Sequence, residues 1–246
     1  MAERAALITG ASSGIGLAIA RLLGEEDYGV TVASRTPEKL EAATDELRSA
    51  GLDVHSVPAN VVNEEEIVAL VASHRERFGR LDVLVNNAGV GIGAALEEYP
   101  TKALDLQLGV NLRSYVIATR EALPMLKEAG AEHGKALIVN TASIAGKSGQ
   151  GWLSVYSATK AGVIGLSEAT QKEVANAGIQ VTAFCPGFVD TPMTEWVREQ
   201  VDREEMIRPE DIAEGVRFLL ATSPNCLVPE ILFLRPDELM PGGQAP

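Results

Sequence analysis

Tyr156 and Lys160 stand at positions i and i+4, so they share one face if their segment is helical. A phenol titrates near pH ~10, and a neighbouring ammonium stabilises the phenolate and lowers that pKa. A ketone that gains a hydride needs a proton, which such a phenol can donate. Ser143 can hydrogen-bond the carbonyl oxygen as negative charge grows on it. The three side chains therefore predict hydride transfer coupled to proton exchange.

A glycine-rich segment, Thr9-Gly10-Ala11-Ser12-Ser13-Gly14-Ile15-Gly16, joins an apolar run to a helical pattern. Gly10 permits a tight turn, Gly14 lets backbone approach a pyrophosphate, and Gly16 allows close packing of helix and strand. The N-terminus of the following helix offers N–H groups and a positive dipole end to phosphates. The segment predicts a dinucleotide-binding loop.

The end of the second apolar run distinguishes the two nicotinamide dinucleotides. An acidic residue there would bind the ribose 2′-hydroxyl of NAD, but this chain has Ser34 followed by Arg35. A hydroxyl and a guanidinium suit a 2′-phosphate. The sequence therefore predicts NADP (NADPH) as cofactor, with NAD less favoured. The glycine loop has no basic residue, so this preference depends largely on Arg35.

Short and almost continuous apolar runs alternate with longer helical patterns, as expected of strands buried on both faces. The runs cover residues 5–9, 30–33, 54–57, 81–85, 136–140, 180–184 and 231–234. The alternation predicts right-handed βαβ units and an α/β fold. We expect a Rossmann-type doubly wound parallel sheet of about seven strands with helices on both faces. One domain then spans residues 1–246 and ends in a loose tail over 236–246.

Two helices have clear start or stop signals. Asn63 can cap a helix that has an acidic first turn, Arg75 and Arg77 in its last turn, and Gly79 just beyond. Pro209 opens another helix, because proline is tolerated in a first turn.

Composition excludes several classes of function. The chain has 21 basic and 34 acidic residues, and its formal net charge of −13 argues against nucleic acid or an anionic membrane as partner. Apolar stretches are too short to span a bilayer, and the N-terminus lacks a signal-peptide pattern. The two cysteines and three histidines have no disulfide or metal-ligand spacing, so no metal is expected. We expect a cytoplasmic protein with a small-molecule substrate.

Together these features resemble one family, the short-chain dehydrogenases/reductases in their single-domain form, over about residues 5–235. The motifs that carry the resemblance are the glycine loop, Asn86-Asn87-Ala88-Gly89, Asn111, Ser143, Tyr156-x-x-x-Lys160 and Pro186-Gly187. The resemblance implies that Tyr156 is the general acid/base and that Ser143 orients the substrate. It also implies that Lys160 holds the nicotinamide ribose and lowers the tyrosine pKa. Asn111, the fourth expected catalytic residue, would position a water that links the lysine to a proton relay.

The resemblance also assigns cofactor contacts. Asn87 and Gly89 would secure the fourth strand and the adenosine side, and Val189 and Thr191 would contact the carboxamide and pyrophosphate. Asn60-Val61 replaces the family's aspartate-valine beside the adenine, where an amide can still hydrogen-bond. The expected cofactor-binding residues are Gly10, Ser12, Ser13, Gly14, Ile15, Gly16, Ser34, Arg35, Asn60, Val61, Asn87, Gly89, Tyr156, Lys160, Pro186, Gly187, Val189 and Thr191.

Substrate recognition is expected from a lid over about residues 188–208 that closes over bound cofactor. Apolar residues in and near it favour a small to medium hydrophobic ketone or alcohol, although they could instead pack the lid on itself. The expected substrate contacts are Ser143, Trp152, Tyr156, Phe188 and Met193.

The leading interpretation is an NADP(H)-dependent carbonyl reductase or alcohol dehydrogenase. A 3-oxoacyl-carrier-protein reductase is an alternative, but it needs a basic site mouth and the available cations are scattered. They are Arg113, Arg120, Lys147 and Lys172. A non-catalytic NADP-binding scaffold or sensor is a third possibility, which the complete catalytic set disfavours.

The family forms homodimers or homotetramers, often by pairing the helices that carry Asn111 and Tyr156. An apolar outer face for such pairing is expected from Thr159, Ala161, Val163, Ile164, Leu166 and Ala169.

Overall fold

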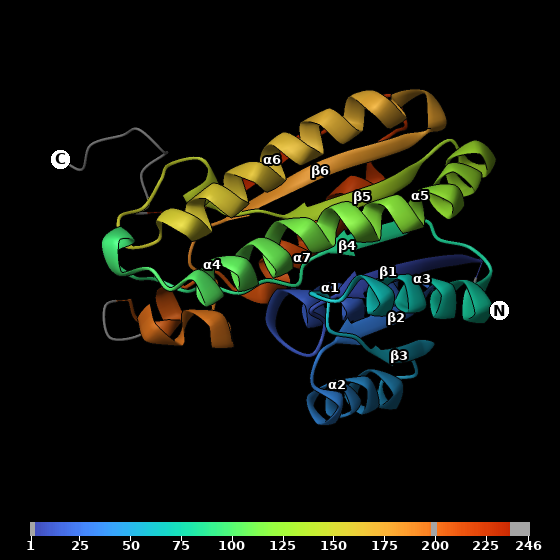
Figure 1. Ribbon diagram of the computed structural model, residues 1–246. Coiled ribbons are helices and arrows are strands. Elements are labelled where there is room, and N and C mark those ends of the chain that lie inside the picture. The colour runs from blue at the N-terminus through green and yellow to red at the C-terminus, as the bar shows by residue number, and fades with distance from the viewer. Residues whose placement is uncertain (1–2, 198–200, 237–246) are drawn as a thin grey trace.

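A parallel β-sheet forms the centre of the protein in the computed structural model, which describes residues 3–197 and 201–236 (Figure 1). Within these residues the sheet has seven strands in the order β3-β2-β1-β4-β5-β6-β7. The strands are β1 (Arg4–Thr9), β2 (Tyr28–Ser34), β3 (Val54–Pro58), β4 (Val83–Asn86), β5 (Ala136–Thr141), β6 (Ile179–Pro186) and β7 (Glu230–Phe233). Each overlaps one of the predicted runs, so the predicted fold class is confirmed. The strand order reverses between β1 and β4, where such sheets open a crevice for ligands.

Helices cover both faces of the sheet, as Figure 1 shows with α5 and α6 in front and α1 and α7 behind. The long helices are α1 (Gly14–Glu25), α2 (Pro37–Ser49), α3 (Glu64–Phe78), α4 (Thr101–Leu108), α5 (Ser114–His133), α6 (Ser154–Val174) and α7 (Pro209–Ala221). Successive residues of a strand point to opposite faces of the sheet, so they contribute to two separate hydrophobic cores. Ile8 and Val85 pack toward α1 and α7, whereas Leu7 and Leu84 pack toward α3 and α5.

Of the two signals predicted for α3, the glycine stop at its end is present and the side-chain cap at its start is not. Gly79 has a φ of 72° and its N–H bonds the carbonyl of Arg75, so the predicted glycine stop is confirmed. Asn63 occupies the position before the helix, but its side chain does not accept a backbone N–H. Its amide instead donates to Glu66 Oε1 at 2.5 Å, because Glu66 folds back over the helix start. The prediction of a side-chain cap was therefore wrong.

The C-terminal helix begins as its sequence indicates. Pro209 is the first residue of α7, and the carboxylate of Asp211 accepts the backbone N–H of Arg208 at 3.0 Å. Of the predicted tail, residues 237–246 lie outside the described part of the chain, as do residues 198–200 of the predicted lid. Among the described helices none is long and apolar enough to cross a membrane.

Candidate functional site

The loop between β1 and α1 is a cradle of bare backbone. Gly10 and Gly14 have positive φ values of 69° and 55°, which glycine adopts without strain. A Cβ on Gly16 would lie 2.4 Å from the carbonyl oxygen of Gly10, so a larger residue would push α1 away from the loop. A Cβ on Gly14 would lie 2.8 Å from Thr191 Cγ2, so the segment after β6 reaches over the loop. This cradle at a helix N-terminus fits a pyrophosphate.

Asn87 joins three strand ends beside this cradle. Its backbone N–H donates to Thr9 Oγ1 at 3.0 Å, and its side-chain amide donates to the carbonyls of Thr9 and Gly10 at 3.1 and 3.2 Å. Its Oδ1 accepts the hydroxyl of Thr141 at 3.2 Å. Asn87 therefore fixes the loop relative to β4 and β5, while its contact with the cofactor stays a prediction.

The carboxyl end of β2 carries two groups without partners. Ser34 Oγ is buried and makes no hydrogen bond, and Arg35 is exposed with no ion pair to any described residue. A buried polar atom without a partner is uncommon, since its desolvation is then uncompensated. A hydroxyl and a free guanidinium side by side in sequence fit a ribose phosphate. Asn60, in contrast, already has a hydrogen-bond partner within the protein, because its Oδ1 accepts the N–H of Val62 at 3.3 Å.

Ser143, Tyr156 and Lys160 come together at the carboxyl edge of the sheet. Ser143 follows β5, and the other two residues lie in the first turns of α6. Lys160 Nζ donates to the carbonyl of Thr141 at 2.6 Å and lies 5.7 Å from the ring centroid of Tyr156. Ser143 Oγ accepts the N–H of Ala145 at 3.1 Å. The predicted catalytic side chains therefore share one site.

Burial controls the two titratable groups of this site. Burial raises the pKa of Tyr156, and a hydrogen bond with Ser143 lowers it only in part. Burial lowers the pKa of the Lys160 ammonium to about 8. In the protein alone, desolvation of the phenol outweighs the lowering effect of Ser143, so the net shift of the Tyr156 pKa is upward. The lowering of this pKa by Lys160 stays a prediction. A protonated Tyr156 suits the donation of a proton.

Asn111 lies in a turn of π-helix, Gly109–Arg113, between α4 and α5. It is fully buried, and its side chain pairs with the backbone of Val90: Nδ2 donates to the carbonyl at 2.9 Å and Oδ1 accepts the N–H at 2.8 Å. Nδ2 also contacts Thr159 Oγ1 at 3.2 Å. Its role in positioning a water stays a prediction.

The expected substrate residues lie at different distances from the centre. Met193 is 42% exposed, and its side chain lies over Gly89 and Gly91 beside Tyr156. Trp152 is 55% exposed and has a φ of 66°, and its ring lies against Gly93 at the rim of the site.

Phe188 is half-buried, and its ring centroid lies 5.9 Å from the guanidinium of Arg235, so it faces the C-terminal segment. The carbonyl of Pro186 accepts a hydrogen bond from Ser143 Oγ at 3.5 Å, and the N–H of Gly187 donates to the carbonyl of Phe233 in β7 at 2.8 Å. Val189 is buried and forms a bridge with Ile207 inside the expected lid.

Two residues that shape the site, Thr141 and Gln107, were not predicted from the sequence. Thr141 supplies the carbonyl that holds Lys160 and the hydroxyl that holds Asn87. Its place at the end of the fifth apolar run could have revealed it. Gln107 is fully buried beside the loop after β4. A glutamine one helical turn before Asn111 was a signal only in retrospect.

A phosphate cradle at the switch point of a parallel sheet, next to a serine, a tyrosine and a lysine, defines a dinucleotide-binding oxidoreductase. The sequence model of the family described as short chain dehydrogenase matches residues 4–202. The chain belongs to this family.

Several similar proteins are named as ketoreductases or ketoacyl reductases. A Streptomyces coelicolor protein provisionally named a ketoacyl reductase is 40% identical and aligns over 92% of this chain and 94% of its own length. A variant of actinorhodin polyketide ketoreductase with NADPH superposes with a TM-score of 0.86, at 37% identity, over 94% of this chain and 97% of that one. A 3-ketoacyl-(acyl-carrier-protein) reductase from Brucella melitensis, complexed with NADH, superposes with a TM-score of 0.85, at 30% identity, over 94% and 96%.

Proposed function

We propose that this protein is an NADP(H)-dependent oxidoreductase that transfers a hydride between the nicotinamide and a carbonyl or secondary alcohol. The observation that carries the proposal is the meeting of Ser143, Tyr156 and Lys160 beside the glycine cradle. As a carbonyl reductase or alcohol dehydrogenase, it needs one proton donor at the carbonyl oxygen and one holder of the cofactor ribose. Tyr156 and Lys160 supply these groups.

Side chains of the protein supply the proton for the reaction and orient the carbonyl substrate. A bound nicotinamide supplies or accepts the hydride. In reduction, Tyr156 Oη gives its proton to the carbonyl oxygen, and Ser143 Oγ donates a hydrogen bond to the same oxygen as charge develops there. Lys160 is fixed by the carbonyl of Thr141, and its remaining N–H groups can bind the ribose hydroxyls.

The preference for NADP over NAD is supported by the unpartnered groups at the end of β2. Ser34 Oγ has no hydrogen-bond partner, and Arg35 has no carboxylate to neutralise it among the described residues. Both can be engaged by a 2′-phosphate without the loss of an existing bond. Measurement of kcat/KM with NADPH and with NADH tests this preference, and a clear advantage for NADH would overturn it.

The remaining cofactor contacts and the lid belong to the same proposal. Thr191 stands over Gly14, and Arg203 forms an ion pair of 2.6 Å with Asp190 across the segment that follows β6. We expect the segment 188–208 to close over bound cofactor within a single domain. NADPH should then protect this segment from proteolysis, and identical digestion with and without NADPH would argue against closure.

A 3-oxoacyl-carrier-protein reductase is the second candidate, because two similar proteins are named ketoacyl reductases. It is less well supported by the charges near the site. Arg113 pairs with Glu64, Arg120 pairs with Glu64 and Glu121, and Lys147 pairs with Glu230. Three of the four expected cations therefore have carboxylate partners within the chain. An acidic carrier protein has few free cations to bind.

Steady-state NADPH oxidation against a broad carbonyl library tests these alternatives. The proposal predicts turnover of free ketones, while a preference of about tenfold or more for the carrier-bound form of a 3-oxoacyl group over its small thioester would favour the second candidate. NADPH binding without turnover of any compound would favour the non-catalytic sensor.

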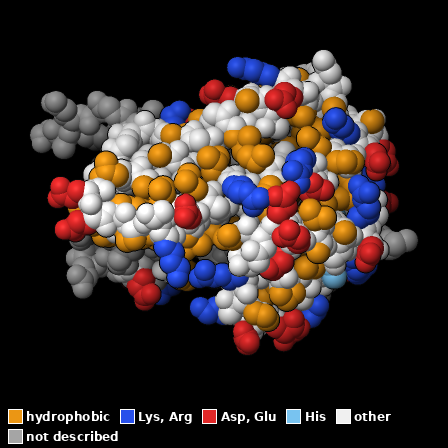
Figure 2. All heavy atoms as spheres, viewed as in Figure 1, with side chains coloured by type: hydrophobic (Ala, Val, Ile, Leu, Met, Phe, Trp, Pro, Cys, Tyr) orange, Lys and Arg blue, Asp and Glu red, His pale blue; other side chains and the backbone are white. Residues whose placement is uncertain are grey.

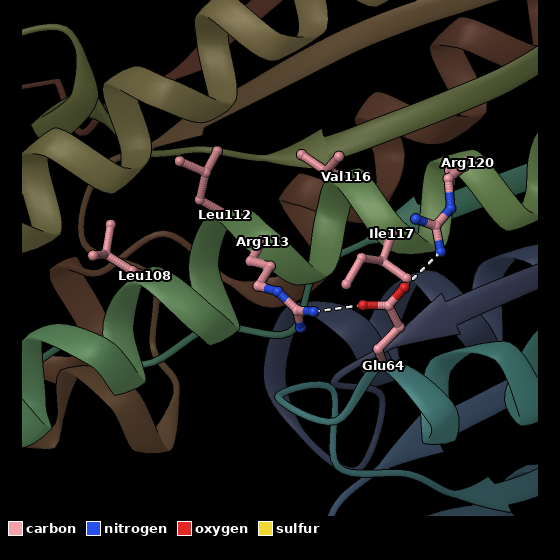
Figure 3. Close-up of a pocket in the computed structure, with 7 residues that line it drawn as sticks. All are labelled: Glu64, Leu108, Leu112, Arg113, Val116, Ile117 and Arg120. Carbon is pink, nitrogen blue, oxygen red and sulfur yellow. Dashed lines mark hydrogen bonds and ion pairs between the residues drawn. The ribbon is translucent and has the colours of Figure 1, made fainter.

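We also infer a homo-oligomer that pairs α4, α5 and α6. Figure 2 shows hydrophobic side chains gathered over α4 and α6. A groove of about 490 Å³ lies along α4 and α5, and in it Glu64 reaches between Arg113 and Arg120 (Figure 3). Leu108 and Val116 at this groove are 41% and 45% exposed. Thr159 and Val163 were wrongly assigned to the outer face, because both are buried against the site and core.

The expected partners are otherwise a small-molecule carbonyl or alcohol, with no nucleic acid and no membrane. The thiols are free, with Cys185 buried and Cys226 exposed. Free thiols suit a reducing compartment, so we place the protein in the cytoplasm.

A further inference from the structure

An extended segment after β4, residues 90–94, passes beside Tyr156 and is held at every second residue. The backbone of Val90 pairs with the side chain of Asn111. The backbone of Ile92 pairs with the side chain of Gln107, and the N–H of Ala94 donates to the carbonyl of Trp152 at 2.9 Å. Gln107 lies near the end of α4, and Asn111 lies one turn later in the π-turn. Their side-chain amides supply the hydrogen bonds that a neighbouring strand would otherwise give to this segment.

Gln107 makes the central attachment. Its side chain is fully buried, at 0% exposure, so its amide must find partners inside the protein. Oε1 accepts the N–H of Ile92 at 3.0 Å, and Nε2 donates to the carbonyl of Ile92 at 3.3 Å and to the hydroxyl of Tyr99. Tyr99 Oη donates in turn to the same carbonyl at 3.0 Å. Among the described residues, each hydrogen bond of the Gln107 side chain therefore secures Ile92, directly or through Tyr99.

The residues between these attachments form the wall of the site. A Cβ on Gly91 would lie 4.0 Å from Tyr156 Cε2, and a Cβ on Gly93 would lie 2.2 Å from the ring of Trp152. Ile92 joins these two glycines, so a shift of its backbone moves both. The space open to a substrate beside Tyr156 thus depends on where Gln107 holds Ile92.

We propose that Gln107 is a positioning residue for the reaction: it clamps the backbone of Ile92 and thereby sets how a carbonyl substrate is oriented against Tyr156. This inference rests on the proposed function. Gln107 touches neither the reacting atoms nor the cofactor cradle, so its loss should change substrate orientation and leave cofactor binding intact.

The substitution Gln107→Met tests the clamp, because methionine is unbranched and of similar length but offers neither the amide donor nor its acceptor. On a prochiral ketone from the library, we expect KM to rise about tenfold and the enantiomeric ratio of the alcohol to fall severalfold, since small misplacements near the chemistry are costly. The Kd for NADPH should stay within about twofold of the wild type, because the phosphate cradle is untouched.

Hydrogen–deuterium exchange gives a readout that does not depend on activity. The amide of Ile92 should exchange at least about tenfold faster in Gln107→Met, because its acceptor is gone. If the wild-type protein reduces no ketone, the proposed function fails, and the exchange rate still decides whether Gln107 clamps the segment.

Tyr99→Phe is the matched second variant, and it serves if Gln107→Met does not fold. It removes the hydroxyl bond to Ile92 and leaves the direct pair between Gln107 and Ile92, so the same changes should appear in smaller measure. A purely structural role would lower the melting temperature of the variants and leave KM, enantiomeric ratio and exchange at Ile92 unchanged. That result would overturn the proposal.

Discussion

At the scale of single residues, desolvation favours the neutral forms of both Tyr156 and Lys160. Burial raises the pKa of the phenol and lowers that of the ammonium to about 8. The protein alone is therefore prepared to donate a proton from Tyr156 near neutrality. The charge on Lys160, in contrast, is lost progressively as pH rises through about 8.

This difference predicts a pH dependence for cofactor capture. The kcat/KM for NADPH reports groups of the free enzyme, so it should decline severalfold as pH rises through about 8 and the Lys160 ammonium deprotonates. The variant Lys160→Arg keeps its charge at all accessible pH values and should lose this inflexion, whatever its absolute activity. A wild-type profile that is flat from about pH 7 to 9.5 would contradict the assignment.

Arg35 should account for most of the discrimination between the two dinucleotides. A hydrogen bond to a charged group contributes about 1.5–3 kcal/mol, so Arg35→Ala should lower the ratio of kcat/KM for NADPH to that for NADH about 10- to 100-fold. Arg75→Ala removes an exposed arginine from α3 and serves as the control. An equal ratio in the wild type and Arg35→Ala would show that the 2′-phosphate is bound elsewhere.

At the scale of elements, strands were more predictable than the contacts between elements. Strands of a parallel sheet are buried on both faces, and their apolar runs are visible in one sequence. The π-turn Gly109–Arg113 and the clamp by Gln107 have no such local pattern, because each depends on a segment distant in sequence. The predicted cap at Asn63 was wrong for a local reason, because the side chain of Asn63 bonds Glu66 three residues later.

The catalytic side chains were predictable because their residue types and their spacing along the chain both limit where they can lie in the fold. Tyr156 and Lys160 need only a helix to share a face, and the ends of parallel strands gather at one edge. The directions of their pKa shifts were less accessible, because burial is a property of the packed site. Trp152 and Phe188 illustrate the same limit: their types suggested a pocket, while their burial and neighbours differ.

The attachment of α3 to β2 predicts a separate pH effect on stability. The buried His74 donates from Nε2 to the carbonyl of Arg80 at 2.8 Å, so Nδ1 must stay unprotonated to accept the hydroxyl of Thr31 at 2.7 Å. Burial accordingly lowers the pKa of His74 from 6.5 to about 4.

Because the unfolded chain takes up this proton at a higher pH, the stability from neutral His74 is present above about pH 6.5 and is lost as pH falls toward 4. Urea unfolding should therefore show His74→Gln losing less stability than the wild type over that range, by up to about 3 kcal/mol. Parallel pH curves for the two proteins would refute the prediction.

At the scale of the whole molecule, the net charge of −13 coexists with an anionic ligand because the favourable groups are local. The N-terminus of α1, Arg35 and Lys160 surround the expected path of the cofactor. Many of the other described arginines are paired with carboxylates, as in the bridges of Glu64 with Arg113 and Arg120. The overall charge therefore argues against polyanionic partners, while the local groups leave the site competent for a small anion.

The inferred homo-oligomer predicts that charge on the α5 face disrupts assembly. Val116→Glu should shift sedimentation toward a smaller species, because the buried carboxylate would be desolvated at the interface. Val68→Glu on α3 is the matched control, since Val68 is exposed to a similar degree, 40% against 45%. If both variants sediment as the wild type does, the interface lies elsewhere or does not form.

The central claim is that Tyr156 donates the proton in carbonyl reduction, and Tyr156→Phe tests it most directly. The substitution removes one hydroxyl and retains the ring. The measurement is single-turnover NADPH oxidation with an accepted ketone, together with the Kd for NADPH. We predict that the rate falls about 10²- to 10⁴-fold, as for the loss of a general acid, while the Kd changes little. Turnover that continues undiminished in Tyr156→Phe would contradict the mechanism.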